Sequence, residues 1–449
     1  MFAAPRILVI DDKRVHLDAI SEAFRQLGSP CLGIHFDPAR DMDRSHFRGV
    51  RHLFADLHLI DAGASSDHRP HFALIANLLE NNIHPDGGPF MLVVWTQHAQ
   101  LSNALKDYLD ANLAADKPYA RPVAVLALDK TRYINVNSGS PLSPEAVAAL
   151  RADVMAAIGA VPQLQALLDW ESDVLAASGA TLSTLLSLVP PAQRTSAEFP
   201  GALDDILSRL AREAVGKSNV AADPRAAITS ALAPILSDRI VNQQPGAASV
   251  ALWAQAVTRQ MANAPDLSPE EAGRINRMLH IAVPGPENIR PSDWGAVVDF
   301  PPEWWNDDRL QDLFGVNRAT LLTDELKVPP ANHAPCRPCL VRIGAACDHA
   351  QGRRGPLTYL FGLEIPAEVQ RIKVNNKVPV PASEWSGPFF LLDGVPAAFT
   401  LHVNCRFPLS ITASKCAAWT PRYRLREQIL ITLITHANSY LSRPGILRV

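Results

Sequence analysis

The stretch RILVIDDKR, residues 6–14, decides the fold of the N-terminal region. Four apolar residues, 7–10, come directly before two adjacent carboxylates, Asp11 and Asp12, as expected of a buried strand that ends at a polar edge. Short apolar runs alternate with helical patterns from here to about residue 160. We expect strands at 6–10, 31–36, 50–59, 89–95 and 122–128, and helices at 15–27, 72–79, 101–113 and 143–158. This alternation predicts an α/β domain, residues 1–160, on a doubly wound, five-stranded parallel sheet.

The composition excludes several classes of protein. The chain has 449 residues, 47% of them hydrophobic, which is enough for large cores and about two to four domains. No apolar run reaches the roughly 18 residues of a membrane span, and the first residues lack the features of a secretory signal. Six cysteines, five of them after residue 330, are too few for a disulfide scaffold and fit a reducing compartment. We therefore expect a cytoplasmic protein that does not insert into a membrane.

Two further regions follow the α/β domain. Residues 161–283 carry almost only amphipathic helical patterns, which predict an all-α connector or bundle. Residues 284–449 contain short strand-like runs separated by Gly, Pro and Asn, and then a helix over residues 422–441. This pattern predicts a β-rich C-terminal domain, a small barrel or sandwich, that ends in a helix.

The charge is distributed unevenly along the chain. From residue 334 onward 14 Lys and Arg stand against 6 Asp and Glu, a net charge of +8. Because the whole chain carries −3, the first 333 residues carry −11. An acidic front and a basic end indicate different partners for the two parts, or contact between them.

Polar residues follow the predicted strands where each of them ends. Asp11 and Asp12 end the first strand, and Asp56 lies at the end of the third. Thr96 ends the fourth strand, and Lys130 follows the fifth. Because ligands of a doubly wound sheet bind outside the carboxyl ends of its strands, these side chains are expected to converge.

This set of side chains has a coherent chemistry. Carboxylate oxygens are the ligands that Mg²⁺ prefers, and clustered acids repel one another without a cation. A further carboxylate, Asp56, can act as a nucleophile that accepts a phosphoryl group. Thr96 and Lys130 can then bind the phosphoryl oxygens.

The order Asp-Asp, Asp, Thr, Lys on successive strand ends resembles the receiver domain of bacterial response regulators. The spacing from Asp12 to Asp56, 56 − 12 = 44 residues, is typical of that family, and the resemblance covers about a third of the chain. The resemblance implies the following roles: Asp56 as phosphoacceptor; Asp11, Asp12, Asp56 and the backbone carbonyl of His58 as Mg²⁺ ligands; Thr96 as switch hydroxyl; and Lys130 as phosphate-binding lysine.

The chain departs from the family pattern at three positions. Gln97 follows the threonine where receivers usually have a small residue, and Thr131 replaces the usual proline after the lysine. Ala127 stands where a switch aromatic is common. These departures leave two readings open, namely a receiver that is phosphorylated and a degenerate pseudo-receiver that assembles proteins without phosphotransfer.

A group of cysteines and histidines marks a second candidate site. Cys336, Cys339, Cys347 and His349 could supply four zinc ligands. The alternative is that these are small buried cysteines of a β-domain, because side chains on a strand alternate between its faces.

Arginines near the C-terminus form a third candidate site. They are Arg353 and Arg354 in a glycine-flanked loop, and Arg422, Arg424 and Arg426 before the last helix. With tyrosines nearby they could bind anions or nucleic acid, or they could form a solvated face. The sequence contains no convincing helix-turn-helix or zinc-finger pattern.

These features together predict a response-regulator-like signalling protein. Its receiver would be switched by Mg²⁺-dependent phosphorylation at Asp56 and would control a C-terminal output domain, with at most self-phosphorylation as an enzymatic activity. The C-terminal segments faintly resemble uncharacterised receiver-containing proteins of bacterial antiviral conflict systems, so a histidine kinase or defence-system components are expected partners. A nucleic-acid-binding effector is the remaining alternative, and oligomers are compatible with all three readings.

Overall fold

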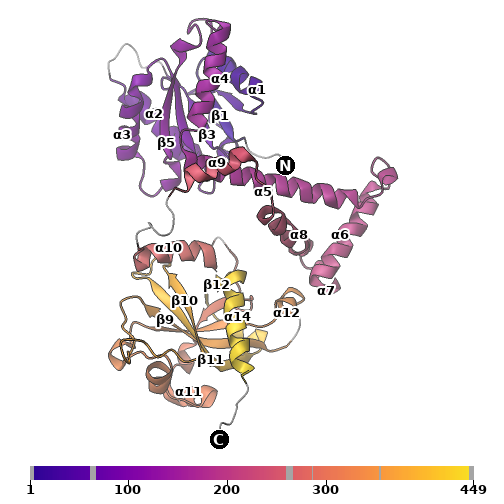
Figure 1. Cartoon of the computed structure of the whole chain (residues 1–449), viewed down its shortest axis with the longest axis vertical. Helices are drawn as coiled ribbons and strands as arrows, with labels where there is room; N and C mark the ends of the chain where they lie inside the picture. The colour runs from indigo at the N-terminus through magenta and orange to yellow at the C-terminus, as the bar shows by residue number, and fades with distance from the viewer. Residues whose placement is uncertain (1–4, 61–66, 259–265, 286, 353–354, 444–449) are drawn as a thin grey trace. The chain divides into compact units, whose positions relative to one another are not determined.

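The computed structural model describes residues 5–60, 67–258, 266–285, 287–352 and 355–443 (Figure 1). Arg353 and Arg354 lie outside these described residues. The chain divides into two compact units, Met1–Ala177 with Asn242–Gln260, and Ser178–Val241 with Met261–Val449. Each unit is built on a sheet of its own.

The first unit contains a five-stranded sheet in the order β2-β1-β3-β4-β5, with every neighbouring pair parallel. The strands are β1 (Ile7–Asp11), β2 (Leu32–His35), β3 (His52–Ala55), β4 (Met91–Thr96) and β5 (Ala124–Asp129). This is the flavodoxin-like order of a doubly wound fold, and it fits a receiver-like domain. The order reverses between β1 and β3, so the carboxyl ends of these two strands flank the expected ligand position.

Four helices cover the two faces of this sheet. They are α1 (Arg14–Gln26), α2 (Arg69–Asn82), α3 (Ser102–Asn112) and α4 (Pro144–Ile158). Leu17 and Ile20 of α1 share a core with Leu150 of α4, whereas Phe72 of α2 and Leu105 of α3 belong to the core of the opposite face. The predicted α/β domain is therefore confirmed, because helices bury the apolar residues on both sides of the parallel strands.

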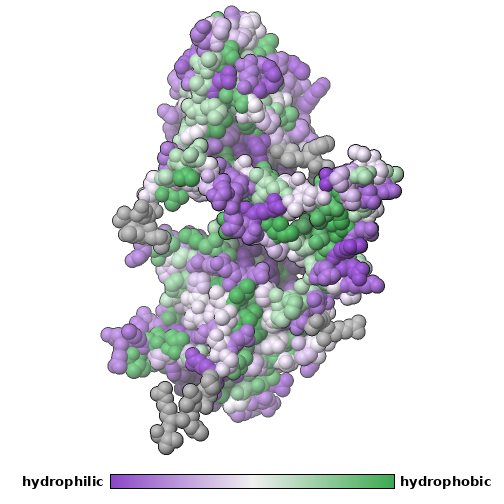
Figure 2. All heavy atoms as spheres, turned by 45° about the vertical axis from the view of Figure 1, so that its right-hand side comes forward, coloured by the Kyte–Doolittle hydropathy of each residue, from purple (hydrophilic) through white to green (hydrophobic). Residues whose placement is uncertain are grey.

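A helical region joins the two sheets in the sequence. It comprises α5 (Pro162–Ser187), α6 (Phe199–Val215), α7 (Lys217–Val220), α8 (Pro224–Val241), α9 (Ala247–Ala256) and α10 (Pro269–His280). The prediction of an all-α middle region is confirmed. In the first unit, Ser249 and Trp253 of α9 donate hydrogen bonds to Asp169 of α5 at 2.5 and 3.1 Å. Large apolar side chains such as Leu182 and Ile235 stay exposed on these helices, and Figure 2 shows apolar surface there.

None of the described helices alone has the length and apolar composition to cross a bilayer. The helices at 144–158 and 162–187 meet that criterion only as a pair, and the chain bends by 91° between them.

The second unit contains a seven-stranded sheet in the order β10-β11-β9-β8-β7-β12-β6, with every neighbouring pair antiparallel. The strands are β6 (Ile281–Ala282), β7 (Ala296–Asp299), β8 (Arg337–Ile343), β9 (Leu357–Pro366), β10 (Glu384–Phe390), β11 (Phe399–Ile411) and β12 (Pro421–Leu425). The remaining helices are α11 (Asp307–Phe314), α12 (Ala346–Ala350), α13 (Ala413–Cys416) and the terminal α14 (Glu427–Leu441). The prediction of a β-rich domain with a terminal helix is confirmed.

This sheet has two separate cores, which corrects the expectation of a barrel or sandwich. Ile429 and Leu433 of α14 pack into one core with Val341 of β8, and Leu310 of α11 packs into the other with Leu340 of the same strand. The described strands form one sheet, because helical segments bury both of its faces and a second sheet is not needed.

Candidate functional site

The residues predicted from the strand ends lie at the carboxyl edge of the first sheet. Asp11 is the last residue of β1, and Asp56 follows β3 directly. Thr96 is the last residue of β4, and Lys130 follows β5. Each of these four is less than a tenth exposed. The fold therefore holds two carboxylates, a hydroxyl and an ammonium in buried positions at one edge, which we call the acidic pocket.

Lys130 lies at the centre of the acidic pocket. Its ammonium donates hydrogen bonds to Asp11 Oδ2 at 2.6 Å and to Asp56 Oδ2 at 2.7 Å. The Lys130 side chain is 1% exposed, and it is 5.9 Å from the ring centre of Trp95. In this arrangement the single positive charge of Lys130 balances only part of the charge of the two carboxylates.

The third partner of Lys130, His16, was not predicted from the sequence. Its Nε2 is 2.8 Å from the carbonyl oxygen of Val136, so Nε2 carries the proton and Nδ1 accepts from Lys130 at 3.2 Å. Burial lowers the pKa of His16, which is consistent with this neutral ring. A signal existed, because His16 lies in the first turn of α1, the helix that follows β1 directly at the edge where Asp11 lies.

The carboxylates differ in their environment. Burial raises the pKa of Asp11 to about 7, the charge of Asp56 adds to this, and Lys130 opposes it. Asp11 Oδ1 also accepts from the backbone N–H of Lys13 at 2.9 Å. Asp12 is half-buried, and its Oδ1 is buried without a hydrogen-bond partner among the described residues.

These donors fit a divalent cation. Ligand atoms of Asp11, His16 and Asp56 lie within 4.8 Å of one another. The unpartnered oxygen of Asp12 adds a ligand that no described residue uses, and hard oxygen ligands suit Mg²⁺. The backbone N–H of His58 is 3.4 Å from Asp56 Oδ1, so the His58 backbone lies beside this carboxylate.

The three departures from the receiver pattern have local explanations. Gln97 is exposed, and among the described residues no hydrogen bond joins it to Asp56. Thr131 lies in the short 3₁₀ turn Lys130–Arg132, where its backbone N–H and hydroxyl donate to Asp129 Oδ1 at 3.0 and 2.7 Å. The hydroxyl of Thr96 accepts from the His98 backbone N–H at 3.2 Å, and Ala127 is half-buried on β5.

The structure does not bring the four predicted zinc ligands together. Cys336 and Cys339 belong to the two different cores of the second sheet, while Cys347 is exposed on α12 and His349 lies two residues further on. Burial raises the pKa of Cys336 to about 11 and that of Cys339 well above its usual value. Cys336 and Cys339 are therefore separate side chains of the two cores rather than one ligand set.

The described arginines of the third candidate site pair with acids of their own unit. Arg422 forms ion pairs with Glu364 and Asp299. Arg424 and Arg426 contact the carboxylate of Glu287 at 3.0 and 3.4 Å. Their charge is thus balanced within the unit rather than presented as a uniform basic surface.

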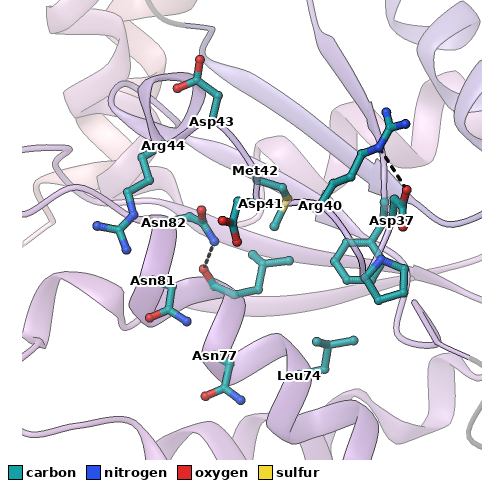
Figure 3. A pocket seen from close by; sticks show the side chains of 13 residues that line it. Asp37, Arg40, Asp41, Met42, Asp43, Arg44, Leu74, Asn77, Asn81 and Asn82 are labelled. Atoms are coloured by element: carbon teal, nitrogen blue, oxygen red, sulfur yellow. Dashed lines mark hydrogen bonds and ion pairs between the residues drawn. The ribbon is translucent and has the colours of Figure 1, made fainter.

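A hollow of about 800 Å³ on the first unit lies between the segment 36–44 and α2 (Figure 3). Figure 3 shows Asn77, Asn81 and Asn82 of α2 on one side and the Asp37–Arg40 ion pair on the other. The hollow is lined by amides and paired charges, and its lining has no buried lysine between carboxylates as the acidic pocket does. We therefore assign the chemistry to the acidic pocket.

No protein-family model matches this chain, and no curated protein matches it. Among solved structures, a response regulator from Thermotoga maritima aligns with 28% of this chain and 85% of its own, at 15% identity and a TM-score of 0.17.

One prediction concerns the pH dependence of stability. Because the pKa of Asp11 is raised to about 7 in the folded protein, the folded state keeps a proton that the unfolded chain releases at lower pH. With a chelator present, the free energy of unfolding should therefore fall as pH rises to 7, by up to about 1.4 kcal/mol per pH unit from this group. In Asp11→Asn this contribution should be absent, which urea unfolding at several pH values would show.

Comparing the unchanged chain with Asp11→Asn isolates the contribution of Asp11 to the pH dependence of stability. Burial and the neighbouring His71 and His98 lower the pKa of His58 to about 4, so this histidine makes stability rise with pH over part of the same range. That contribution is common to both proteins and cancels in their difference. A difference that stays constant between about pH 5 and 7 would show that Asp11 is not buried as described.

Proposed function

We propose that the first unit is a receiver that accepts a phosphoryl group on Asp56 in a Mg²⁺-dependent reaction and switches the output of the C-terminal domain. The observation that carries the proposal is the Lys130 ammonium held between Asp11 and Asp56 at the switch point of the sheet. A buried cation that shares two carboxylates can move to a new anion when one of them is modified. Mg²⁺ bound by Asp11 and Asp12 would neutralise charge on the phosphoryl oxygens.

The reaction uses residues already in the pocket. A carboxylate oxygen of Asp56 attacks the phosphorus of a small phosphodonor, and the bond to the donor's leaving group breaks with its electron pair on that group. Lys130 then donates to a phosphoryl oxygen instead of the Asp56 carboxylate. Thr96, whose hydroxyl is buried at the end of β4, is positioned on the neighbouring strand to donate to a second phosphoryl oxygen.

The added charge would change the surface that the first unit presents. Losing the Lys130–Asp56 ion pair alters the edge formed by β1, β3 and β5, and a phosphoryl group biases such a two-state element. The C-terminal domain is the output in this proposal, and a histidine kinase or defence-system components are the proposed partners.

The proposal is tested by incubating the full chain with Mg²⁺ and acetyl phosphate and recording its mass. The expected result is one added phosphoryl group that hydroxylamine removes, as an acyl phosphate requires. Asp56→Ala should not acquire it, whereas Asp18→Ala, which removes an exposed carboxylate of the same unit, should. Lys130→Met should retain less of the adduct, because its oxygens lose their cation.

The main rival is a pseudo-receiver adaptor that binds partners without phosphotransfer. It predicts no adduct with any donor, although the chain is folded and binds Mg²⁺. An adduct that persists in Asp56→Ala would likewise reject phosphorylation at this site.

A further inference from the structure

Four histidine rings form a cluster on the first unit beside the acidic pocket. His58 is two residues after Asp56, and His98 is two residues after Thr96, so both leave the same edge of the sheet. His68 and His71 lie at the start of α2, three residues apart and therefore on one side of the helix. The His58 ring centroid is 4.2, 4.6 and 5.6 Å from those of His71, His98 and His68, and that of His68 is 6.2 Å from His98 and 6.4 Å from His71.

Packing alone does not account for these rings. His71 is 5% exposed, and its Nδ1 is buried without a hydrogen-bond partner among the described residues. A buried polar nitrogen without a partner costs free energy that an apolar residue at this position would avoid. The unpartnered nitrogen, in a cluster with three further imidazoles, is suited to a metal ion that accepts nitrogen lone pairs.

We propose that His58, His68, His71 and His98 bind a Zn²⁺ ion, at a site separate from the acidic pocket. Zn²⁺ prefers imidazole nitrogen in tetrahedral geometry with Zn–N distances of about 2.0–2.1 Å. Such geometry places ring centroids about 5 Å apart, and the five separations given above, from 4.2 to 6.4 Å, lie on both sides of that value. The four ligands come from two strand ends and one helix, which the fold fixes relative to one another.

The cluster binds the ion by a small rearrangement. At Asp11, His16 and Asp56 the ligand atoms already lie within 4.8 Å of one another. At the histidine cluster the rings must turn about their side-chain torsions before all four nitrogens aim at one point. Burial and the neighbouring rings lower the pKa values of His58 and His71, which keeps both rings in the neutral form that binds metals.

The test is a Zn²⁺ titration of the full chain in excess Mg²⁺, which fills the acidic pocket, followed by metal analysis of the dialysed protein. We expect one tightly bound Zn²⁺ per chain. His71→Gln and His98→Gln should each weaken binding by about 100-fold or more, since even losing an outer-shell partner costs 10–100-fold. His84→Gln, which removes a histidine of the same unit outside the cluster, should bind as the unchanged chain does.

Asp56→Asn separates this proposal from the proposed function. It should lose the phosphoryl adduct and keep the Zn²⁺. The proposal is overturned if the unchanged chain retains no Zn²⁺, or if both His71→Gln and His98→Gln still bind it. It is also overturned if Asp56→Asn abolishes Zn²⁺ binding and the two histidine variants do not. Circular dichroism of each variant shows whether it is folded. His98 is partly exposed, so His98→Gln disturbs packing less than a substitution at the buried His71.

An independent observation concerns a cavity of about 520 Å³ in the second unit. Arg342 of β8 lines it and is 6% exposed, and its Nε is buried without a hydrogen-bond partner among the described residues. Its Nη1 only approaches the Thr358 carbonyl oxygen, at 3.5 Å, and no described carboxylate forms an ion pair with it. Gly344 keeps space for the guanidinium, because a Cβ there would lie 2.7 Å from Nη1.

We infer that this cavity binds a small phosphate-bearing anion through Arg342. A buried guanidinium with an unpartnered N–H donor is costly, and its planar donors match a phosphate group. His349 and the exposed Arg290 line the same cavity, as does Asp348, which limits the net positive charge. Unlike Arg422 and its neighbours, Arg342 retains donors that protein acids do not use.

Inorganic phosphate is the probe, in the Asp56→Asn background so that the acidic pocket does not contribute. Calorimetry should show saturable binding that Arg342→Gln abolishes and that Arg309→Gln, an exposed arginine of α11, leaves unchanged. Phosphate should also raise the thermal unfolding midpoint of the Asp56→Asn protein. It should leave the midpoint unchanged when Arg342→Gln is added to that background. Absence of phosphate binding, or equal binding in Arg342→Gln, overturns the inference.

Discussion

Replacing Lys130 with methionine is expected to destabilise the metal-free protein by about 3–5 kcal/mol, the usual cost of breaking a buried ion pair from one side. The ammonium contacts Asp11 Oδ2 at 2.6 Å and Asp56 Oδ2 at 2.7 Å, and these side chains are 0% and 10% exposed. Methionine has a similar length but no charge, so the two carboxylates would face each other in a buried site. Urea unfolding in a chelator, with hydrogen exchange of β1 and β3 to localise the effect, would measure this.

Mg²⁺ should restore most of the stability that Lys130→Met loses, because a divalent cation supplies the missing charge. Lys117→Met is the matched control, since Lys117 pairs with Glu80 at 3.7 Å in a partly exposed position and should cost less than about 1 kcal/mol. If Lys130→Met is no more destabilising than Lys117→Met, the acidic pocket is not the buried, lysine-closed site described.

Replacing Arg371 with methionine is expected to have a similarly large effect on the second unit, again about 3–5 kcal/mol. Arg371 Nη2 donates to Glu384 Oε2 at 2.7 Å, and the Glu384 side chain is fully buried. His402 Nδ1 is 2.7 Å from the other carboxylate oxygen. Burial raises the pKa of Glu384, but hydrogen bonds from His402 and Arg371 outweigh it and lower the pKa overall. Losing the guanidinium would leave this carboxylate with too few donors.

The double variant Arg371→Met with Glu384→Met distinguishes a lost charge partner from lost packing. If the cost of the single variant comes from the unpaired carboxylate, removing both charges should recover much of it. Thermal unfolding of the full chain, followed by hydrogen exchange in β10 and β11, measures both. A double variant as unstable as the sum of the single ones would assign the cost to packing instead.

Much of the first unit could be predicted because local patterns determine it. The apolar runs before Asp11, Asp56 and Thr96 are strands, and a parallel sheet necessarily places their carboxyl ends on one edge. His16 was missed because it reaches the pocket through a helix turn, which strand-end reasoning does not consider. The lysine-closed state of the pocket was also missed, because the sequence does not show that Lys130 reaches two carboxylates at once.

The C-terminal region was harder to predict because its decisive contacts are distant in sequence. The cysteines looked like a ligand set, yet Cys336 and Cys339 face different cores of one sheet. Arg422 looked free, yet its partner Glu364 lies 58 residues away on β9. Because β8 and β7 lie between β9 and β12 in the sheet, spacing along the chain carries no information about such a pair.

Phosphorylation of Asp56, in a pocket where the Lys130 ammonium contacts both Asp56 and Asp11, is the step that we propose. The most direct measurement is peptide mapping of the full chain after Mg²⁺ and acetyl phosphate treatment, with borohydride reduction to convert an aspartyl-phosphate to homoserine. We expect homoserine at position 56, and none there in a sample without Mg²⁺. Unmodified aspartate at position 56, or conversion at another carboxylate instead, would contradict it.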